Sequence, residues 1–430
     1  MKRTEIRPPP APWTSTVPAL VFGYGVTALG VVRILHDAGI RAYVIGTKNG
    51  IVTESRWFEA APPSDNGVTP EADLGAYLEG LPIPRAVLIP CVDSWALKIA
   101  ALSGPITDRF PSVLPARAVL ESLIDKSRLA QLAAAVSVPH PRTMRLDQPA
   151  DLAAIPEHAL QTGFFKPCDS ELFFRRFNTK AFWEKSWEKA IRRWREAHDA
   201  GLALLFQEYI PGPPDHHYFL DGFVDRSGHV SALFARRRLR MYPPNFGNST
   251  SMVSVPIEET GNAPEELRRL LDRAGFRGIF SAEFKRDPRD NRLKLLEVNV
   301  RAWWYVDFAA RSGVDVVMMA YRDALGLPAA PVQPYRIGAR CVYPYYDYCA
   351  YRELRRSGQL TFGAWLASLV GASQPLFRWD DPEPAWTELY RVLFGALRNA
   401  AARQARESTL VAGWRTLLAM LRPRADRATG

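Results

Sequence analysis

The sequence predicts a multidomain protein of mixed α/β and α+β class, and three observations support this. The chain has 430 residues, and at roughly 150 residues per domain this length fits about three domains. Residues 18–45 run through an apolar stretch, a glycine-rich turn, a helical pattern and a second apolar stretch, which is typical of a βαβ unit. Residues 202–300 are mostly strand-like, with a helical stretch near 264–274, which is typical of an antiparallel α+β segment.

The composition is that of an ordinary globular protein. Hydrophobic residues make up 47% and charged residues 23% of the chain, which excludes disordered, collagen-like and disulfide-scaffold classes. The net charge of +10 fits an anionic ligand, a nucleic acid or an acidic membrane surface, and does not choose among them. No C-x-x-C motif occurs and no run approaches the ~20 apolar residues of a membrane-spanning helix. We therefore expect a cytoplasmic protein with reduced thiols.

The N-terminal part divides at about residue 17. Residues 1–17 are polar and proline-rich, and we expect them to form a flexible arm. The pattern of residues 18–45 predicts two parallel strands joined by a right-handed crossover through a helix. A further strand at 86–90 leads into a helical run from Trp95, which predicts a small α/β domain over residues 18–120.

The glycine-rich turn at residues 23–30 has a second interpretation, a dinucleotide-binding fingerprint. The third glycine, Gly30, stands two positions later than the G-x-G-x-x-G spacing requires, and the second strand ends without an acidic residue for a ribose. We therefore favour a wall of a substrate cleft over an NAD site.

Residues 121–206 mix short strands with helices. Trp183, Trp187, Ile191 and Trp194 follow one another at spacings of four, four and three, which predicts one apolar face of a helix. Lysines and arginines occupy the opposite face. A core face with a solvated face behind it is favoured over a nucleic-acid-binding surface, because the aromatic and basic residues do not share a face.

Residues 280–301 are the most informative segment. Two strand-like runs flank a polar turn at 287–291, which predicts a β-hairpin. Side chains alternate faces along a strand, so Glu297, Asn299 and Arg301 share one face.

A turn centred near residue 290 would place Glu283 opposite Glu297 or Asn299 on that face. Two carboxylates and an amide oxygen suit Mg²⁺, which usually takes one or two protein carboxylates together with phosphate oxygens. The alternative is a surface hairpin whose charges are solvated.

Two lysines upstream occupy positions that suit phosphate binding. Lys126 opens a helical pattern, and Lys166 stands at the end of an apolar strand, from which a lysine can reach a phosphate. Residues 206–212 form an extended run that ends in a Pro-Gly turn, and such a run can offer backbone donors and acceptors to an adenine edge.

Taken in order, these motifs resemble the ATP-grasp superfamily of carboxylate–amine or carboxylate–thiol ligases. They are Asp-Lys at 125–126, strand-Lys-Pro at 163–167, Q-E-Y-I-P-G at 207–212 and L-E-V-N-V-R at 296–301. The similarity is greatest to the bacterial branch that includes D-aspartate ligases, and it covers roughly residues 18–325.

The resemblance implies a domain plan. A Rossmann-like pre-ATP-grasp domain at 18–120 would precede a two-lobed ATP-grasp fold. The lid subdomain of that fold would span 121–206, and the subdomain with the metal site would span 207–327. A Pro/Tyr-rich linker and a basic helical extension would fill residues 328–430.

The resemblance also implies roles for single residues. Those expected to bind ATP are Lys126, Lys166, Gln207, Glu208, Ile210 and Asp215. Those expected to hold one or two Mg²⁺ ions, or Mn²⁺, are Glu283, Glu297 and Asn299. Those expected to act in catalysis, facing an acyl phosphate or the substrate carboxylate, are Arg301 and Arg238.

The predicted function is that of an ATP-dependent ligase. It would activate a small-molecule carboxylate as an acyl phosphate, join it to an amine and release ADP and phosphate. The alternative is a catalytically weak nucleotide-binding protein that acts at a membrane or partner surface. No nucleic-acid-binding module is recognisable. The identities of acid and amine, the choice between amide and thioester, and the oligomeric state stay open.

The C-terminal tail is strongly basic. Residues 391–430 hold eight arginines and two acidic residues, interleaved with apolar residues. Basic amphipathic helices can lie on anionic membranes, which gives a peripheral membrane contact through residues 385–424 as one interpretation. Helices that pack on the body of the protein or on a partner are the favoured one.

Overall fold

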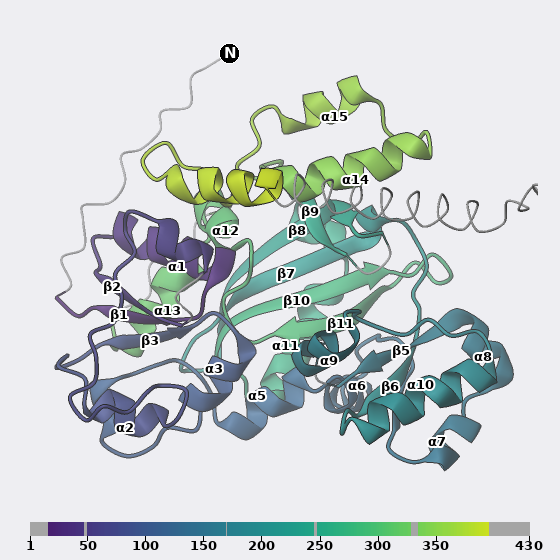
Figure 1. Ribbon diagram of the computed structural model, residues 1–430, viewed down its shortest axis with the longest axis horizontal. Helices are drawn as coiled ribbons and strands as arrows, with labels where there is room; N and C mark the ends of the chain where they lie inside the picture. The colour runs from purple at the N-terminus through teal and green to yellow at the C-terminus, as the bar shows by residue number, and fades with distance from the viewer. Residues whose placement is uncertain (1–15, 47–49, 169, 245–246, 328–333, 395–430) are drawn as a thin grey trace, which may run out of the picture.

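The computed structural model describes residues 16–46, 50–168, 170–244, 247–327 and 334–394 (Figure 1). Within them, the strands form three sheets, with orders β2-β1-β3, β4-β6-β5 and β11-β10-β7-β8-β9-β12. The expected arm at residues 1–17 and the basic tail lie almost entirely outside the described residues.

The N-terminal sheet is parallel. It consists of β1 (Ala19–Phe22), β2 (Ala42–Ile45) and β3 (Val87–Pro90), with β1 in the middle. The helices and turns of this unit are α1 (Gly25–Asp37), η1 (Ile51–Glu54), α2 (Leu74–Glu79), α3 (Asp93–Ile99) and α4 (Ile106–Arg109). The predicted βαβ unit is confirmed, because α1 connects two parallel neighbours.

The small antiparallel sheet follows in the chain. Its strands are β4 (Thr143–Leu146), β5 (Gly163–Pro167) and β6 (Leu204–Glu208). The helices before, within and around it are α5 (Arg117–Ile124), α6 (Lys126–Ala135), α7 (Pro149–Ala153), α8 (Glu157–Thr162), α9 (Ser170–Phe177) and α10 (Trp187–Asp199).

The predicted helical face of four residues is only partly correct, because α10 begins at Trp187. Phe182 forms a β-bridge with Phe165 of β5, so the chain before α10 is extended rather than helical. Trp183 instead stacks on Phe164, with ring centroids 5.7 Å apart. The pairing of Phe182 with β5 therefore prevails over the helical spacing of the residues before Trp187.

The large antiparallel sheet is the centre of the molecule. Its strands are β7 (His217–Val224), β8 (Val230–Tyr242), β9 (Asn248–Ser254), β10 (Gly278–Arg286), β11 (Leu293–Asn299) and β12 (Arg340–Val342). The helical elements of this part are η2 (Pro214–His216), η3 (Ile257–Thr260), α11 (Ala263–Ala274), α12 (Val306–Ser312) and α13 (Val316–Ala324).

The predicted hairpin is confirmed as β10 and β11. In its register Glu283 stands opposite Glu297 and Ser281 opposite Asn299, and an irregularity follows Glu283. Directly opposite residues of an antiparallel pair point to the same face, so both glutamates and the asparagine share one side of the sheet.

One apolar core joins the N-terminal unit to the large sheet. Residues of α1 are buried together with residues of α12 and α13 and with Phe219 and Phe234 of the sheet. Gly30 allows this close approach, since a Cβ at that position would lie 3.2 Å from Val306 Cγ1. The late glycine of the turn therefore serves helix packing.

The C-terminal extension adds two helices, α14 (Pro344–Arg356) and α15 (Phe362–Leu369), and residues 383–394 are also helical. The extension is anchored on the large sheet through fully buried Asp347. Its carboxylate accepts two hydrogen bonds from Arg240, at 2.8 and 2.9 Å, and others from Thr250 and from Trp365 of α15.

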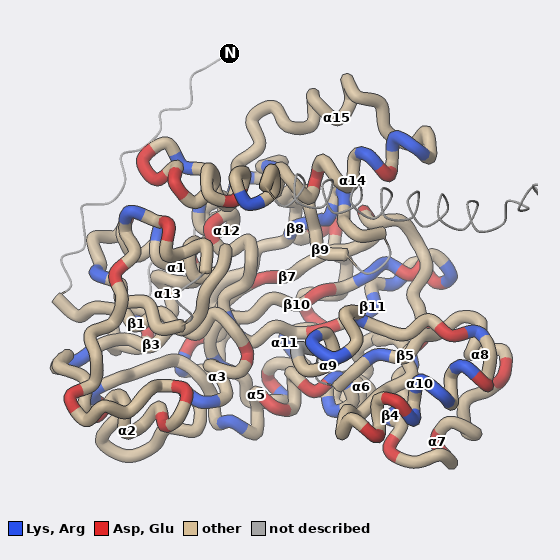
Figure 2. The backbone as a smooth tube through the Cα atoms, viewed as in Figure 1, with Lys and Arg blue, Asp and Glu red and all other residues tan. Residues whose placement is uncertain are grey.

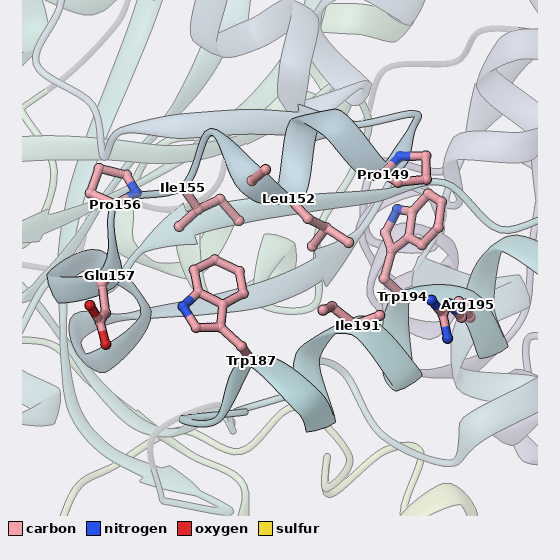
Figure 3. Close-up of a pocket in the computed structure, with 10 residues that line it drawn as sticks. Pro149, Leu152, Ile155, Pro156, Glu157, Trp187, Ile191, Trp194 and Arg195 are labelled. Carbon is pink, nitrogen blue, oxygen red and sulfur yellow. The ribbon is translucent and has the colours of Figure 1, made fainter.

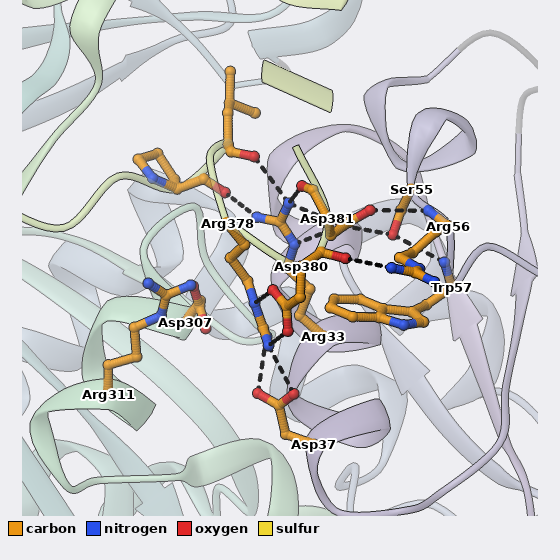
Figure 4. Close-up of polar contacts among 12 residues, drawn as sticks. Arg33, Asp37, Ser55, Arg56, Trp57, Asp307, Arg311, Arg378, Asp380 and Asp381 are labelled. Carbon is orange, nitrogen blue, oxygen red and sulfur yellow. Dashed lines mark hydrogen bonds and ion pairs between the residues drawn. The ribbon is translucent and has the colours of Figure 1, made fainter. Parts of the chain in front are cut away.

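A second anchor ties the extension to α1 (Figure 4). Arg33 is fully buried, and its Nε donates to Asp381 Oδ2 at 3.0 Å while its other nitrogens donate to the carbonyls of Pro375, Leu376 and Asp381. Beside it, Arg378 makes a bidentate ion pair with Asp37. The last described segment therefore completes the packing of the first helix. No helix within the described residues combines the length and apolarity that crossing a bilayer requires.

Candidate active site

A cleft of about 830 Å³ opens where the N-terminal unit, the small sheet and the large sheet meet. Its walls come from the start of α1, from β5 and β6, and from β7, β8, β10 and β11. The sequence-predicted site residues that line it are Lys126, Lys166, Gln207, Glu208, Ile210, Arg238, Glu283, Glu297, Asn299 and Arg301. Segments far apart in the sequence thus contribute to one cavity.

Asp215 is the exception among these residues. It is exposed in η2 and does not line the cleft. Pro213 and Pro214 turn the chain into a short 3₁₀ helix before β7 begins, which carries Asp215 outward. This position does not support the ribose contact that we expected.

Glu283 is held by two partners inside the cleft. His217 Nδ1 lies 2.7 Å from its Oε1, and Arg238 Nη2 donates to the same oxygen at 3.0 Å. Burial alone would raise the pKa of Glu283, but the charge of Arg238 and the hydrogen bond from His217 outweigh burial and hold that pKa well below its usual range. The carboxylate is therefore ionised at neutral pH, with part of its charge already balanced by protein.

Glu297 and Asn299 continue the same face toward the N-terminal unit. Asn299 Nδ2 donates to Glu297 Oε1 at 3.4 Å, and Asn299 Oδ1 accepts from Arg301 Nη2 at 3.1 Å. Arg301 also donates from Nε to Asp93 Oδ1 at 3.1 Å, across to the start of α3. Asp93 thus fixes the arginine that the resemblance assigned to catalysis.

These oxygens fit a hard divalent cation. Glu283 and Glu297 are two carboxylates on one face, and Glu297 makes no ion pair within the described part of the chain. In the described ranges, no three His, Cys, Asp or Glu side chains gather as a self-sufficient metal site. A cation here would draw its remaining ligands from phosphate and water, as Mg²⁺ commonly does.

Two lysines face these carboxylates from the small-sheet side of the cleft. Lys166 is the penultimate residue of β5, and Lys126 begins α6. Desolvation, together with the nearby charge of Lys126, lowers the pKa of Lys166 to about 8, although Glu297 and Glu283 oppose this shift. An anionic ligand would relieve the repulsion between the two ammonium groups.

The segment after β6 forms another side of the cleft. Gln207 is buried and donates from Nε2 to Thr143 at 3.0 Å, while Glu208 pairs with Arg289 at 2.7 Å. Tyr209 carries Lys285 over its ring, with Nζ 4.7 Å from the centroid. The side chains of Gln207 and Glu208, which we expected to bind ATP, are therefore both engaged by other residues of the protein.

Several residues of the cleft were not assigned a role from the sequence. They are His217, Phe219, Lys180, Lys285, Arg236, Trp303, Trp304 and Tyr305. His217 forms part of the cleft wall, whereas the ring of His216 lies against the carbonyl of Arg286. The alternation of His217, Phe219 and Asp221 could have indicated this position from the sequence, because alternate residues of a strand share one face.

Three of the four arginines of β8 are buried and have separate roles. Arg236 is buried against Asp221, Arg238 against Glu283, and Arg240 against Asp347 of the extension. Arg240 does not line the cleft. Irregularities in the β8–β9 register near Leu239 separate it from the other two.

A second cavity lies in the small-sheet part, between α7 and α10 (Figure 3). It has a volume of about 590 Å³, and its walls are mostly apolar, with Trp187, Ile191 and Trp194 from the predicted helical face. It shares no lining residue with the cleft.

Comparison with known proteins adds independent information. No protein-family model matches the chain. It is 22% identical over 247 residues to a D-aspartate ligase of Enterococcus faecium (strain Aus0004), which is 56% of this chain and 58% of the relative. The chain thus matches somewhat more than half of the length of this curated relative.

Solved structures show a similar fold. An N5-carboxyaminoimidazole ribonucleotide synthetase in complex with ADP has a TM-score of 0.57 at 12% identity, over 80% of this chain and 85% of its own. The same kind of enzyme from Thermus thermophilus has a TM-score of 0.55 at 16% identity, over 75% and 81%. An L-amino acid ligase from Bacillus licheniformis has a TM-score of 0.52 at 12% identity, over 75% and 78%. The chain therefore shares the fold of these enzymes, which agrees with the resemblance of its sequence motifs to ATP-grasp ligases.

Proposed function

We propose that the protein is an ATP-dependent ligase that activates a carboxylate as an acyl phosphate and joins it to an amine. The observation that carries this proposal is the convergence in one cleft of Lys126 and Lys166 with Glu283, Glu297 and Asn299. Cations from one wall and hard oxygen ligands from the facing hairpin are what a magnesium triphosphate needs on its two sides.

ATP would lie between the small and the large sheet. Its phosphates would reach Lys126 and Lys166, and its base would rest on the segment from Gln207 to Ile210. Glu297, Asn299 and Glu283 would hold Mg²⁺, which supplies charge neutralisation on the phosphates when bound.

The two arginines proposed for catalysis differ in exposure. Arg301 has a side chain that is 19% exposed in the cleft, whereas that of Arg238 is 5% exposed and bonded to Glu283 and Ser249. Arg301 is thus the better placed to touch the substrate carboxylate and the developing oxyanion. Arg238 is proposed to position Glu283.

The reaction divides into two transfers. A carboxylate oxygen attacks the γ-phosphorus of ATP, and ADP leaves with the electron pair of the broken P–O bond. The amine then attacks the acyl carbon, loses a proton and displaces phosphate. The protein needs no covalent nucleophile, because positioning and charge stabilisation account for both steps.

Oxygen transfer tests the proposal directly. The protein is incubated with MgATP and pooled D- and L-amino acids, with D-aspartate included because the curated relative is named for it. Substrate-dependent phosphate release is expected, and an ¹⁸O-labelled carboxylate should pass one label to the phosphate. Phosphate without label would contradict the acyl phosphate. ATP binding without turnover on any acceptor would favour the catalytically weak binding protein.

A further inference from the structure

The C-terminal extension presents an apolar helix face to solvent. Phe362, Leu366 and Val370 are 54%, 50% and 75% exposed. Because they are four residues apart, they lie on one side of the helix, where Val370 follows directly after α15. The other side of the helix is fixed, since Trp365 stacks on Tyr351 at 4.7 Å and donates to buried Asp347. The exposed side therefore cannot be hidden by rotating α15.

A second set of exposed side chains lies in the same extension. Trp379 is 91% exposed, and Trp386, Tyr390 and Phe394 are 61%, 59% and 52% exposed. The last three again follow a spacing of four within the helical residues 383–394. Figure 1 shows α15 and this helix along one edge of the molecule, above the large sheet. We refer to both sets together as the apolar edge.

The charge around the apolar edge is distributed unevenly. No charged residue occurs from Thr361 to Phe377, so α15 is uncharged throughout, as Figure 2 shows. The exposed end of α14 carries Arg352, Arg355 and Arg356, and Arg356 forms an ion pair with Glu353. Directly after the described helix, residues 395–430 contain seven arginines and two acidic residues. The basic surplus therefore lies at the end of α14 and in the tail, whereas acidic residues outnumber basic ones in residues 378–394.

We propose that the apolar edge docks on an anionic lipid surface. Exposed aromatic and aliphatic side chains suit the interface between acyl chains and headgroups, and neighbouring arginines suit anionic headgroups. The arginine-rich residues 395–430 follow directly after the apolar edge in the sequence. Their net positive charge is complementary to an anionic lipid surface. The inference does not depend on the proposed ligase activity.

Vesicle co-sedimentation of the full chain tests this proposal. Vesicles of phosphatidylcholine alone are compared with vesicles that also contain phosphatidylglycerol. The test variant carries Phe362→Ser, Leu366→Ser and Val370→Ser. The control variant carries Leu172→Ser and Ile337→Ser, which are 51% and 58% exposed but lie outside the apolar edge. A thermal unfolding curve verifies that each variant is folded.

The expected result is salt-sensitive binding to the anionic vesicles, weakened by at least about tenfold in the test variant and unchanged in the control. Three outcomes would overturn the proposal. They are no binding by the unaltered chain, equal binding by the test variant, and a dimer without lipid that the test variant abolishes. The last outcome would assign the apolar edge to a second copy of the chain.

Discussion

His217 Nδ1 lies 2.7 Å from Glu283 Oε1, and their side chains are 8% and 15% exposed. Burial, followed by the positive charge of Arg238, lowers the pKa of His217 to about 4, although Glu283 opposes the shift. The imidazole is therefore neutral at pH 7, and its Nδ1–H donates to the carboxylate. The charge that balances Glu283 comes from Arg238.

This neutral histidine predicts a loss of stability in acid. The pKa of His217 falls from its ordinary value of 6.5 to about 4 on folding. Between these values the unfolded chain binds a proton that the folded chain does not. The free energy of unfolding should therefore fall as pH decreases from 6.5 to 4, by up to about 1.4 kcal/mol per pH unit from this group. Urea unfolding of the unaltered chain and of His217→Asn measures it. Parallel stability curves for the two proteins would contradict the assignment.

Glu297→Gln should abolish most of the proposed activity. The substitution keeps the size of the side chain but removes a formal charge from the predicted cation site, so phosphate release should fall by at least about 100-fold. Asp290→Asn is the matched control, because Asp290 lies at the exposed turn of the same hairpin, paired with Lys294. Similar activities of the two variants would show that the hairpin face has no special role.

Lys166 should make nucleotide affinity depend on pH. Its pKa of about 8 in the free protein means that the ammonium is present at pH 7 and is lost as pH rises through 8. Bound phosphate favours the charged form, so the affinity for MgATP should fall by up to about tenfold per pH unit above 8. Calorimetry from pH 7 to 9 on the unaltered chain and on Lys166→Arg provides the comparison.

Lys166→Arg should flatten this dependence, because arginine stays charged. Lys285 also has a pKa lowered to about 8, by burial and then by Arg238, and accounts for the slope that remains. An identical slope in the two proteins would remove Lys166 from the phosphate site.

Asp381→Ala should destabilise the whole chain. It leaves the buried guanidinium of Arg33 without its carboxylate, and breaking a buried pair costs about 3–5 kcal/mol. Glu59→Gln is the control, since Glu59 pairs with Arg41 on the exposed surface and should leave the unfolding midpoint unchanged. A small loss in both variants would mean that the extension is dispensable for the packing of α1.

Local patterns predicted the elements on which the site is built. Alternation along residues 280–301 was sufficient for the hairpin and for the shared face of Glu297 and Asn299, because strand periodicity and turn chemistry are properties of neighbouring residues. The glycine turn and the apolar runs around it were likewise sufficient for the parallel βαβ unit.

Contacts between distant segments could not be obtained in this way. His217 meets Glu283 only because β7 pairs with β10, and Arg240 meets Asp347 only because the extension returns to the sheet. The run Arg236 to Arg240 looks uniform in sequence, yet a bulge and four different acidic partners separate its four arginines. Asp215, which we expected to contact the ribose, lies outside the cleft because two prolines redirect the chain.

The partner of Arg33 is 348 residues away in the sequence. A ribosome therefore finishes α1 long before it synthesises Asp381, and the nascent N-terminal unit carries a cation without its counter-ion for most of translation. Release of the last segment from the exit tunnel completes that unit. Products of premature termination would keep this defect permanently and be exposed to quality-control proteases.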